Sequence, residues 1–100
     1  MDQARQVTVL FADVSGSTKL YESLGDNAAM EAIARCVDQL RQTVESSGGR
    51  VVKTIGDEVM AVFQTPDAAA FAASNMQYAI DALAPVGATK LGVRIGFHCG

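Results

Sequence analysis

The stretch VTVLFADVSGST (Val7–Thr18) decides the fold, because it joins an apolar strand to a group of small residues through one acidic side chain. β-Branched and aromatic residues without a breaker predict a strand near residues 6–13. That strand ends at Asp13. Serine, threonine and glycine are common where helices begin, so residues 15–18 predict the start of a short helix.

Two helices are expected between this strand and residue 47. The short one ends at Gly25, and Asp26 is the expected N-cap of the longer one. Apolar residues at alternating steps of three and four predict an amphipathic stripe on the longer helix, made of Met30, Ile33, Val37, Leu40 and Val44. Glycine readily takes the left-handed conformation found at helix ends, so Gly48 and Gly49 are expected to end this helix.

The second half of the chain predicts a hairpin, a helix and a strand. Val51–Ile55 and Val59–Phe63 are β-branched runs separated by Gly56–Glu58, which is typical of a hairpin. Threonine followed by proline and aspartate predicts the start of an alanine-rich helix over Thr65–Leu83. Leu91–Phe97 predicts the last strand.

This order of elements predicts an α+β fold over residues 1–100, taken as a single domain. We expect a ferredoxin-like βαββαβ core, in which a mostly antiparallel sheet has its helices on one face. The last strand runs to Gly100 without a closing helix or a polar tail. We therefore expect these residues to be the first part of a longer domain.

Composition excludes several classes of function. A formal net charge of −3 and an isoelectric point near 4.9 argue against a protein that binds nucleic acid through phosphates. No apolar run approaches the roughly 20 residues of a membrane span, so we expect no membrane contact from this segment. Cys36 and Cys99 lack metal-ligand spacing and are interpreted as reduced thiols, which predicts a cytoplasmic location.

Asp13 and Asp57 are the candidate metal ligands. Each follows an apolar strand, and both carboxylates would project from one end of the sheet if those strands are neighbours. Carboxylate oxygens beside a loop of small residues suit Mg²⁺ and a polyphosphate, whose oxygens the amides of roughly Val14 to Ser17 would face. Taken singly, Asp13 is equally explained as a capping or turn residue, and Asp57 is better explained as a turn residue at a hairpin tip.

Two charged residues near this hairpin have competing interpretations. Lys53 interrupts an otherwise apolar strand, either as a surface lysine on an edge strand or as a donor to a ligand near the sheet. Glu58 could add a third carboxylate, but we interpret it as a solvated turn residue.

Three motifs together resemble the class III nucleotidyl cyclases, a family that includes adenylate and guanylate cyclase catalytic domains. Phe11–Thr18 is similar to the first metal motif of that family, Val52–Glu58 to its second, and Arg94–Gly100 to the strand after its third helix. The three occur in the expected order and cover essentially the whole chain.

The resemblance implies a two-metal reaction that converts ATP to 3′,5′-cyclic AMP and pyrophosphate. Asp13 and Asp57 would hold two Mg²⁺ or Mn²⁺ ions per site, with the backbone carbonyl of Val14 as a further ligand. The phosphate loop would consist of Val14, Ser15, Gly16, Ser17 and Thr18.

The resemblance also implies a substrate choice and a partner. Lys53 matches the position that reads the base; adenine N1 accepts a hydrogen bond from lysine, whereas guanylate cyclases typically carry glutamate there. Because family sites combine metal aspartates from one subunit with the lysine of the other, we expect a head-to-tail homodimer with composite sites. The second base contact and the transition-state asparagine and arginine lie beyond Gly100 in the family, so residues 1–100 alone are expected to be inactive.

Two other functions remain open. One is a cyclase-like domain that does not catalyse and serves in dimerisation or sensing; retention of Asp13, Asp57 and Lys53 together argues against it. The other is a diguanylate cyclase, but Ile55–Val59 lacks the second glycine and the phenylalanine of that hairpin. A guanylate cyclase ranks below an adenylate cyclase because of Lys53.

Overall fold

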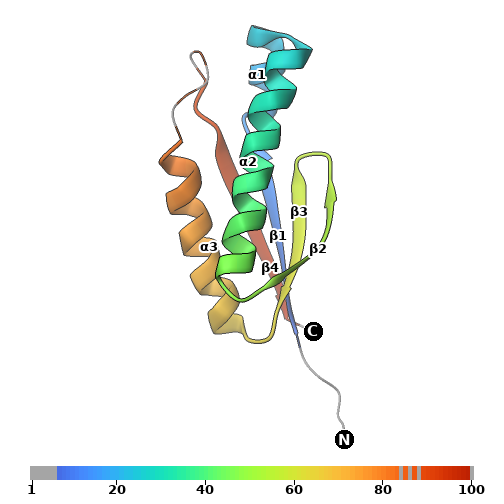
Figure 1. Cartoon of the computed structure of the whole chain (residues 1–100), viewed down its shortest axis with the longest axis vertical. Helices are drawn as coiled ribbons and strands as arrows, with labels where there is room; N and C mark the ends of the chain where they lie inside the picture. The colour runs from blue at the N-terminus through green and yellow to red at the C-terminus, as the bar shows by residue number, and fades with distance from the viewer. Residues whose placement is uncertain (1–6, 84, 86, 88, 100) are drawn as a thin grey trace, which may run out of the picture.

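The elements follow one another in the expected order in a computed structural model that describes residues 7–83, 85, 87 and 89–99 (Figure 1). Within these residues the strands and helices are β1 (Thr8–Ser15), α1 (Ser17–Leu24), α2 (Asp26–Ser46), β2 (Arg50–Ile55), β3 (Glu58–Phe63), α3 (Pro66–Asp81) and β4 (Gly92–Cys99). The α+β prediction is confirmed.

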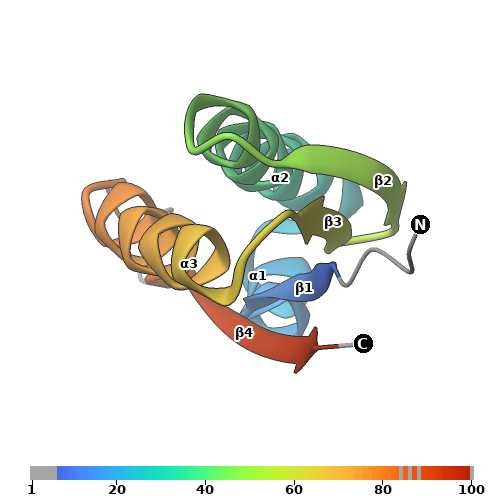
Figure 2. The same cartoon turned by 90° about the horizontal axis from the view of Figure 1, so that it is seen from below.

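The strands form one sheet in the order β2-β3-β1-β4, and every neighbouring pair is antiparallel. β1 therefore lies beside β3, as is needed for Asp13 and Asp57 to project from the same end of the sheet. Helices α2 and α3 pack on the same side of this sheet (Figure 2).

Alternation along the central strands separates a core face from an open face. In β1, Leu10, Ala12 and Val14 are buried, while the residues between them are more exposed, as a period of two requires. The core lies between the sheet and the two long helices, and its largest fully buried side chains include Phe63, Leu10, Leu20, Leu40, Met76, Ile80 and Val44.

The open face carries polar and exposed apolar side chains together. Residues opposite one another in the register share a face, so Asp13 lies between Glu58 and Arg94 across three strands. In the adjoining row, Phe11 lies opposite Met60, which is opposite Lys53.

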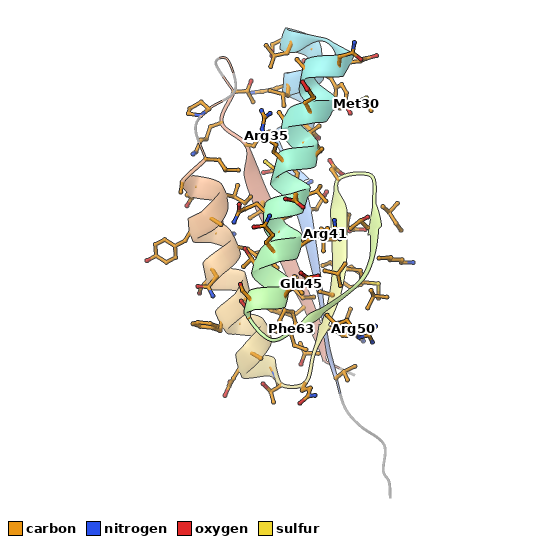
Figure 3. The ribbon with its side chains drawn as sticks, in the orientation of Figure 1. Met30, Arg35, Arg41, Glu45, Arg50 and Phe63 are labelled. Atoms are coloured by element: carbon orange, nitrogen blue, oxygen red, sulfur yellow. The ribbon has the colours of Figure 1, made fainter. Side chains whose placement is uncertain are left out.

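Three details differ from expectation. Asp26 is the first residue of α2 rather than its cap, because Gly25 occupies that position. Met30 belongs to the expected stripe but is 58% exposed; it lies near the N-terminal end of α2 (Figure 3). β1 continues to Ser15, because its last residues pair with β4.

Helix α3 begins as expected and has an additional contact at its end. The hydroxyl of Thr65 accepts a hydrogen bond from the Ala68 amide at 3.0 Å, which confirms the predicted N-cap. At the other end, Lys90 Nζ donates to the backbone carbonyls of Asp81 and Leu83 at 2.6 Å each. These bonds satisfy carbonyl groups that a helix end leaves without partners.

Gly49 is required by close packing, which gives a stability prediction. A Cβ atom at this position would lie 2.6 Å from Cζ of Phe63, whose side chain is only 2% exposed and cannot move aside. We expect Gly49→Ala to lower the free energy of unfolding by about 1–3 kcal/mol in urea titrations. Gly96→Ala is the control, because its Cβ would meet nothing within 4 Å. Equal stabilities of the two variants would contradict this packing.

Candidate functional site

The two candidate aspartates come together at one end of the sheet. Asp13 lies in β1, and Asp57 lies in the turn between β2 and β3. The Val14 amide donates to the backbone carbonyl of Asp57 at 3.0 Å, and the Ser17 hydroxyl donates to Asp57 Oδ2 at 3.1 Å. The hairpin turn is thus attached to the point where β1 passes into α1.

The link between β1 and α1 is a single residue, Gly16. Its φ of 96° lies in the left-handed region, which a side chain would strain. The first intrahelical bond of α1 runs from the Leu20 amide to the Gly16 carbonyl at 3.2 Å. The amides of Ser17, Thr18 and Lys19 therefore have no carbonyl partner within α1, and such N–H groups are suited to bind an anion.

The residues of the expected phosphate loop are divided between β1 and the start of α1. Val14 and Ser15 belong to β1, and the Val14 amide is already bonded to Asp57. That amide therefore already has a partner, whereas the amides of Ser17, Thr18 and Lys19 have none within α1.

One cavity of about 350 Å³ gathers nearly all the candidate residues. Its walls are formed by Asp13, Val14, Ser15, Gly16, Ser17, Thr18, Lys19, Asp57 and Arg94. Every candidate metal and phosphate residue is in this set, and Lys53 is not.

Burial and negative charge act on the Asp13 carboxyl group. Burial raises its pKa above the ordinary value, and the charge of Asp57 and a hydrogen bond between the two carboxyl groups raise it further. Arg94 lowers the same pKa, and Glu58 adds a smaller increase. Two carboxylates that resist simultaneous ionisation form a site that a divalent cation would stabilise.

The raised pKa gives a prediction for the metal-free protein. In an unfolded chain the pKa of an aspartate is about 3.9. Stability linked to protonated Asp13 is therefore complete below that pH and is lost as pH rises through the higher folded-state pKa. We expect Asp13→Asn to raise the free energy of unfolding at pH 7, by only about 0.5 kcal/mol because the side chain is 35% exposed.

Urea titrations with and without Mn²⁺ check this prediction. The difference should shrink as the pH falls below about 3.9, because Asp13 then becomes protonated in the folded and the unfolded chain alike. Mn²⁺ should stabilise the wild type more than the variant. A variant that is less stable than the wild type at pH 7 without metal would contradict it.

Arg94 is a member of the site that the sequence analysis did not assign. Its Nη2 lies 3.4 Å from Asp13 Oδ2, and its side chain is 76% exposed. Such an exposed ion pair contributes little to stability. The sequence did contain one indication of a functional role, because an arginine interrupts the apolar run Leu91–Phe97. The proximity of Arg94 to Asp13, however, follows only from the β1–β4 register.

Lys53 lies on the edge strand β2 and is exposed, as its surface interpretation predicted. It lines a separate cavity of about 310 Å³ with Phe11, Ile55, Glu58 and Met60, on the open face. The structure therefore does not bring Lys53 into the cavity of the aspartates within one chain.

The donor set fits Mg²⁺ or Mn²⁺. In the part of the chain that the structure describes, no group of three or more histidine, cysteine or acidic side chains could hold a metal, so Glu58 does not complete a three-carboxylate site. Mg²⁺ in phosphoryl-transfer sites is usually held by one or two carboxylates, with phosphates and water completing its ligands. Asp13 and Asp57 supply two carboxylates of this kind.

Cys36 has no part in this site. It is a free cysteine, 2% exposed, and burial raises the pKa of its thiol. A protonated buried thiol is inert, so Cys36 belongs to the core. The side chain of Cys99 lies outside the described residues. Among the described residues, no helix combines the length and the apolar character needed to cross a bilayer.

Comparisons with known sequences identify cyclase relatives. An adenylate cyclase of Anabaena cylindrica is 29% identical over 106 residues, which cover 96% of this chain and 21% of that protein. An adenylate cyclase of Glutamicibacter nicotianae is 37% identical over 60 residues, which cover 60% of this chain and 15% of that protein. The chain thus spans about a fifth or less of these relatives.

Comparisons with solved structures give the same fold. A bacterial light-regulated adenylyl cyclase superimposes with a TM-score of 0.84 and 28% identity, covering 98% of this chain and 31% of that one. The guanylyl cyclase domain of the RhoGC fusion protein from Blastocladiella emersonii, described as a non-canonical dimer, superimposes with a TM-score of 0.83, and the match covers 96% of this chain and 57% of that one. At 21% identity, the second likeness concerns the fold alone.

A family model described as the adenylate and guanylate cyclase catalytic domain matches residues 1–100. The match includes both aspartates, the glycine link and the strand that carries Arg94. This chain belongs to the adenylate and guanylate cyclase catalytic domain family.

Proposed function

We propose that this chain is part of an adenylate cyclase, which converts ATP to 3′,5′-cyclic AMP and pyrophosphate. The observation that carries the proposal is the convergence of Asp13, Asp57, Arg94 and the start of α1 on one cavity. Two carboxylates for metal ions and a set of cationic or N–H donors for phosphates meet there. This is the composition that phosphoryl transfer requires.

In the reaction, the ribose 3′-oxygen forms a bond to the α-phosphorus and the bond to the pyrophosphate oxygen breaks. Two Mg²⁺ or Mn²⁺ ions held by Asp13, Asp57 and the Val14 carbonyl would polarise the α-phosphate and lower the pKa of the 3′-hydroxyl. The amides of Ser17, Thr18 and Lys19 would bind the triphosphate at the positive end of α1. Arg94, which lines the same cavity, would donate to phosphate oxygens.

The choice of ATP over GTP rests on Lys53. Its ammonium group has only donors, which suits the N1 acceptor of adenine and not the N1–H of guanine. The names of the two curated relatives, both adenylate cyclases, support the same choice.

The proposed partner is a second copy of this chain, arranged head to tail. Within one chain Lys53 and the aspartates line separate cavities, although Lys53 and Asp13 both lie on the open face. Phe11 and Ile55 beside Lys53 are 37% and 58% exposed, and a subunit packed on this face would bury them.

The proposal concerns the protein at its full natural length, in the cytoplasm. Residues 1–100 cover between 31% and 57% of the two similar structures described above. The groups that stabilise the transition state in the family have no counterpart among the candidate residues here. We therefore propose that residues 1–100 alone bind metal weakly and do not turn over ATP.

A cyclase assay with Mn²⁺ on the full-length protein tests this proposal, with ATP and GTP offered separately. We expect cyclic AMP from ATP and little cyclic GMP from GTP. A folded dimer that converts neither nucleotide would contradict the proposal and favour a non-catalytic module. A preference for GTP would make the protein a guanylate cyclase.

A further inference from the structure

The turn that carries Asp57 has little packing to hold it in place. On its α2 side, Gly56 and Asp57 line a cavity of about 670 Å³ together with Tyr21, Met30, Val37 and Arg41 of the helices. Most residues of β2, the outer strand of this hairpin, are exposed, including Lys53, Thr54 and Ile55. Core contacts therefore do not fix the Asp57 carboxylate.

Two hydrogen bonds hold this turn to the β1–α1 junction. The bond from the Val14 amide to the Asp57 carbonyl fixes the backbone at 3.0 Å. The bond from the Ser17 hydroxyl to Asp57 Oδ2, at 3.1 Å, joins side chains 40 positions apart in the sequence. Of these two bonds, the one from Ser17 reaches the carboxylate itself, which also shares a hydrogen bond with the Asp13 carboxyl group.

The hydroxyl of Ser17 is directed away from its own helix. Serine at the start of a helix usually bonds to nearby backbone groups. Ser23, further along α1, does so by donating to the Lys19 carbonyl at 3.0 Å. In contrast, the α1 N-cap is Gly16, which has no side chain to offer, and Ser17 donates across to Asp57.

We propose that Ser17 is a positioning residue for the metal site, one that holds Asp57 in the orientation that binds the divalent cation. This inference rests on the proposed function, because it assumes that Asp57 is a metal ligand. The Ser17 bond engages Oδ2 and so restricts the rotation of the Asp57 carboxylate. It also restrains Asp57 beside Asp13, where their charges would otherwise drive the two carboxylates apart.

The test compares two variants of the same shape in the full-length protein. Ser17→Thr keeps the hydroxyl, and Ser17→Val replaces it with a methyl group on an otherwise similar side chain. Mn²⁺ binding is measured without nucleotide, by electron paramagnetic resonance of the free ion or by calorimetry. We expect the threonine variant to bind like the wild type and the valine variant to bind about 10-fold more weakly, at the lower end of outer-sphere effects.

Activity and thermal unfolding separate positioning from a general structural effect. The valine variant should need about 10-fold more Mn²⁺ for half-maximal rate than the threonine variant does. Its metal-free melting temperature should equal that of the threonine variant. Ser23→Ala, which removes a hydroxyl of α1 outside the site, should change neither Mn²⁺ affinity nor rate.

Equal Mn²⁺ affinity of the threonine and valine variants would overturn the inference and leave the proposed function intact. A valine variant whose weaker binding follows a lower melting temperature would overturn it as well. If the wild-type protein binds no Mn²⁺, both the inference and the proposed metal site fail.

Discussion

Replacing Asp57 by asparagine is expected to reduce cyclase turnover of the full-length protein by on the order of 10³-fold or more. Asparagine keeps the shape of the side chain and an oxygen that can accept the Ser17 hydrogen bond, but it removes the negative charge. Metal ions in such sites contribute several kcal/mol to stabilising charge in the transition state. At about 1.4 kcal/mol for each factor of ten, losing a ligand accounts for this decrease.

The measurement is kcat/KM for ATP over a range of Mn²⁺ concentrations, beside urea unfolding of the same preparation. Asp57→Asn should unfold at the same urea concentration as the wild type or a higher one, because a charge that repels Asp13 is gone. Asp81→Asn is the matched control, since Asp81 is exposed at the end of α3 and has no place in the site. A folded Asp57→Asn protein with activity within about ten-fold of the wild type would refute the metal assignment.

The fold was predictable because most of its signals are local. Alternating burial in β1, the threonine and proline that start α3 and the glycines after α2 all act within a few residues. Two of the errors occur where segments distant in the sequence decide the outcome. β1 extends to Ser15 only because β4 pairs with it, and Met30 is exposed because its part of α2 faces a cavity beside the hairpin turn.

In the candidate site, too, some residues could be predicted from local sequence and others only from the folded chain. Asp13 and Asp57 were predictable as neighbours, because each follows an apolar strand and those strands belong to one sheet. Arg94 was not, since its proximity to Asp13 depends on the register of strands 81 positions apart. The bond from Ser17 to Asp57 is also beyond local inference, because the same serine is equally compatible with an ordinary helix start.

Replacing Lys53 by glutamate is expected to change the preferred nucleotide. The substitution exchanges a donor to adenine N1 for an acceptor that suits the N1–H of guanine. Hydrogen bonds to charged groups contribute about 1.5–3 kcal/mol, so kcat/KM for ATP should fall by about 10- to 150-fold. Activity with GTP should rise relative to ATP, as measured by cyclic AMP and cyclic GMP formed from each nucleotide alone.

Lys53→Met separates loss of the donor from gain of the acceptor. It should lower activity with ATP without favouring GTP, because methionine offers neither a strong donor nor a strong acceptor. Both variants should remain as stable as the wild type, since Lys53 is exposed on an edge strand. An unchanged ratio of ATP to GTP turnover in both variants would mean that Lys53 does not contact the base.

The same variants test whether the site is composite. If Lys53 acts in the site of the partner, mixing inactive Asp57→Asn subunits with Lys53→Glu subunits restores one complete site in each mixed dimer. About half of the dimers would be mixed and each would have one of two sites intact, so about a quarter of wild-type ATP turnover should return. If both residues serve the same subunit, mixing restores nothing, because every Asp57 site would still lack either its carboxylate or its lysine. The recovered fraction therefore decides whether the separate cavities of Lys53 and the aspartates join across a dimer interface.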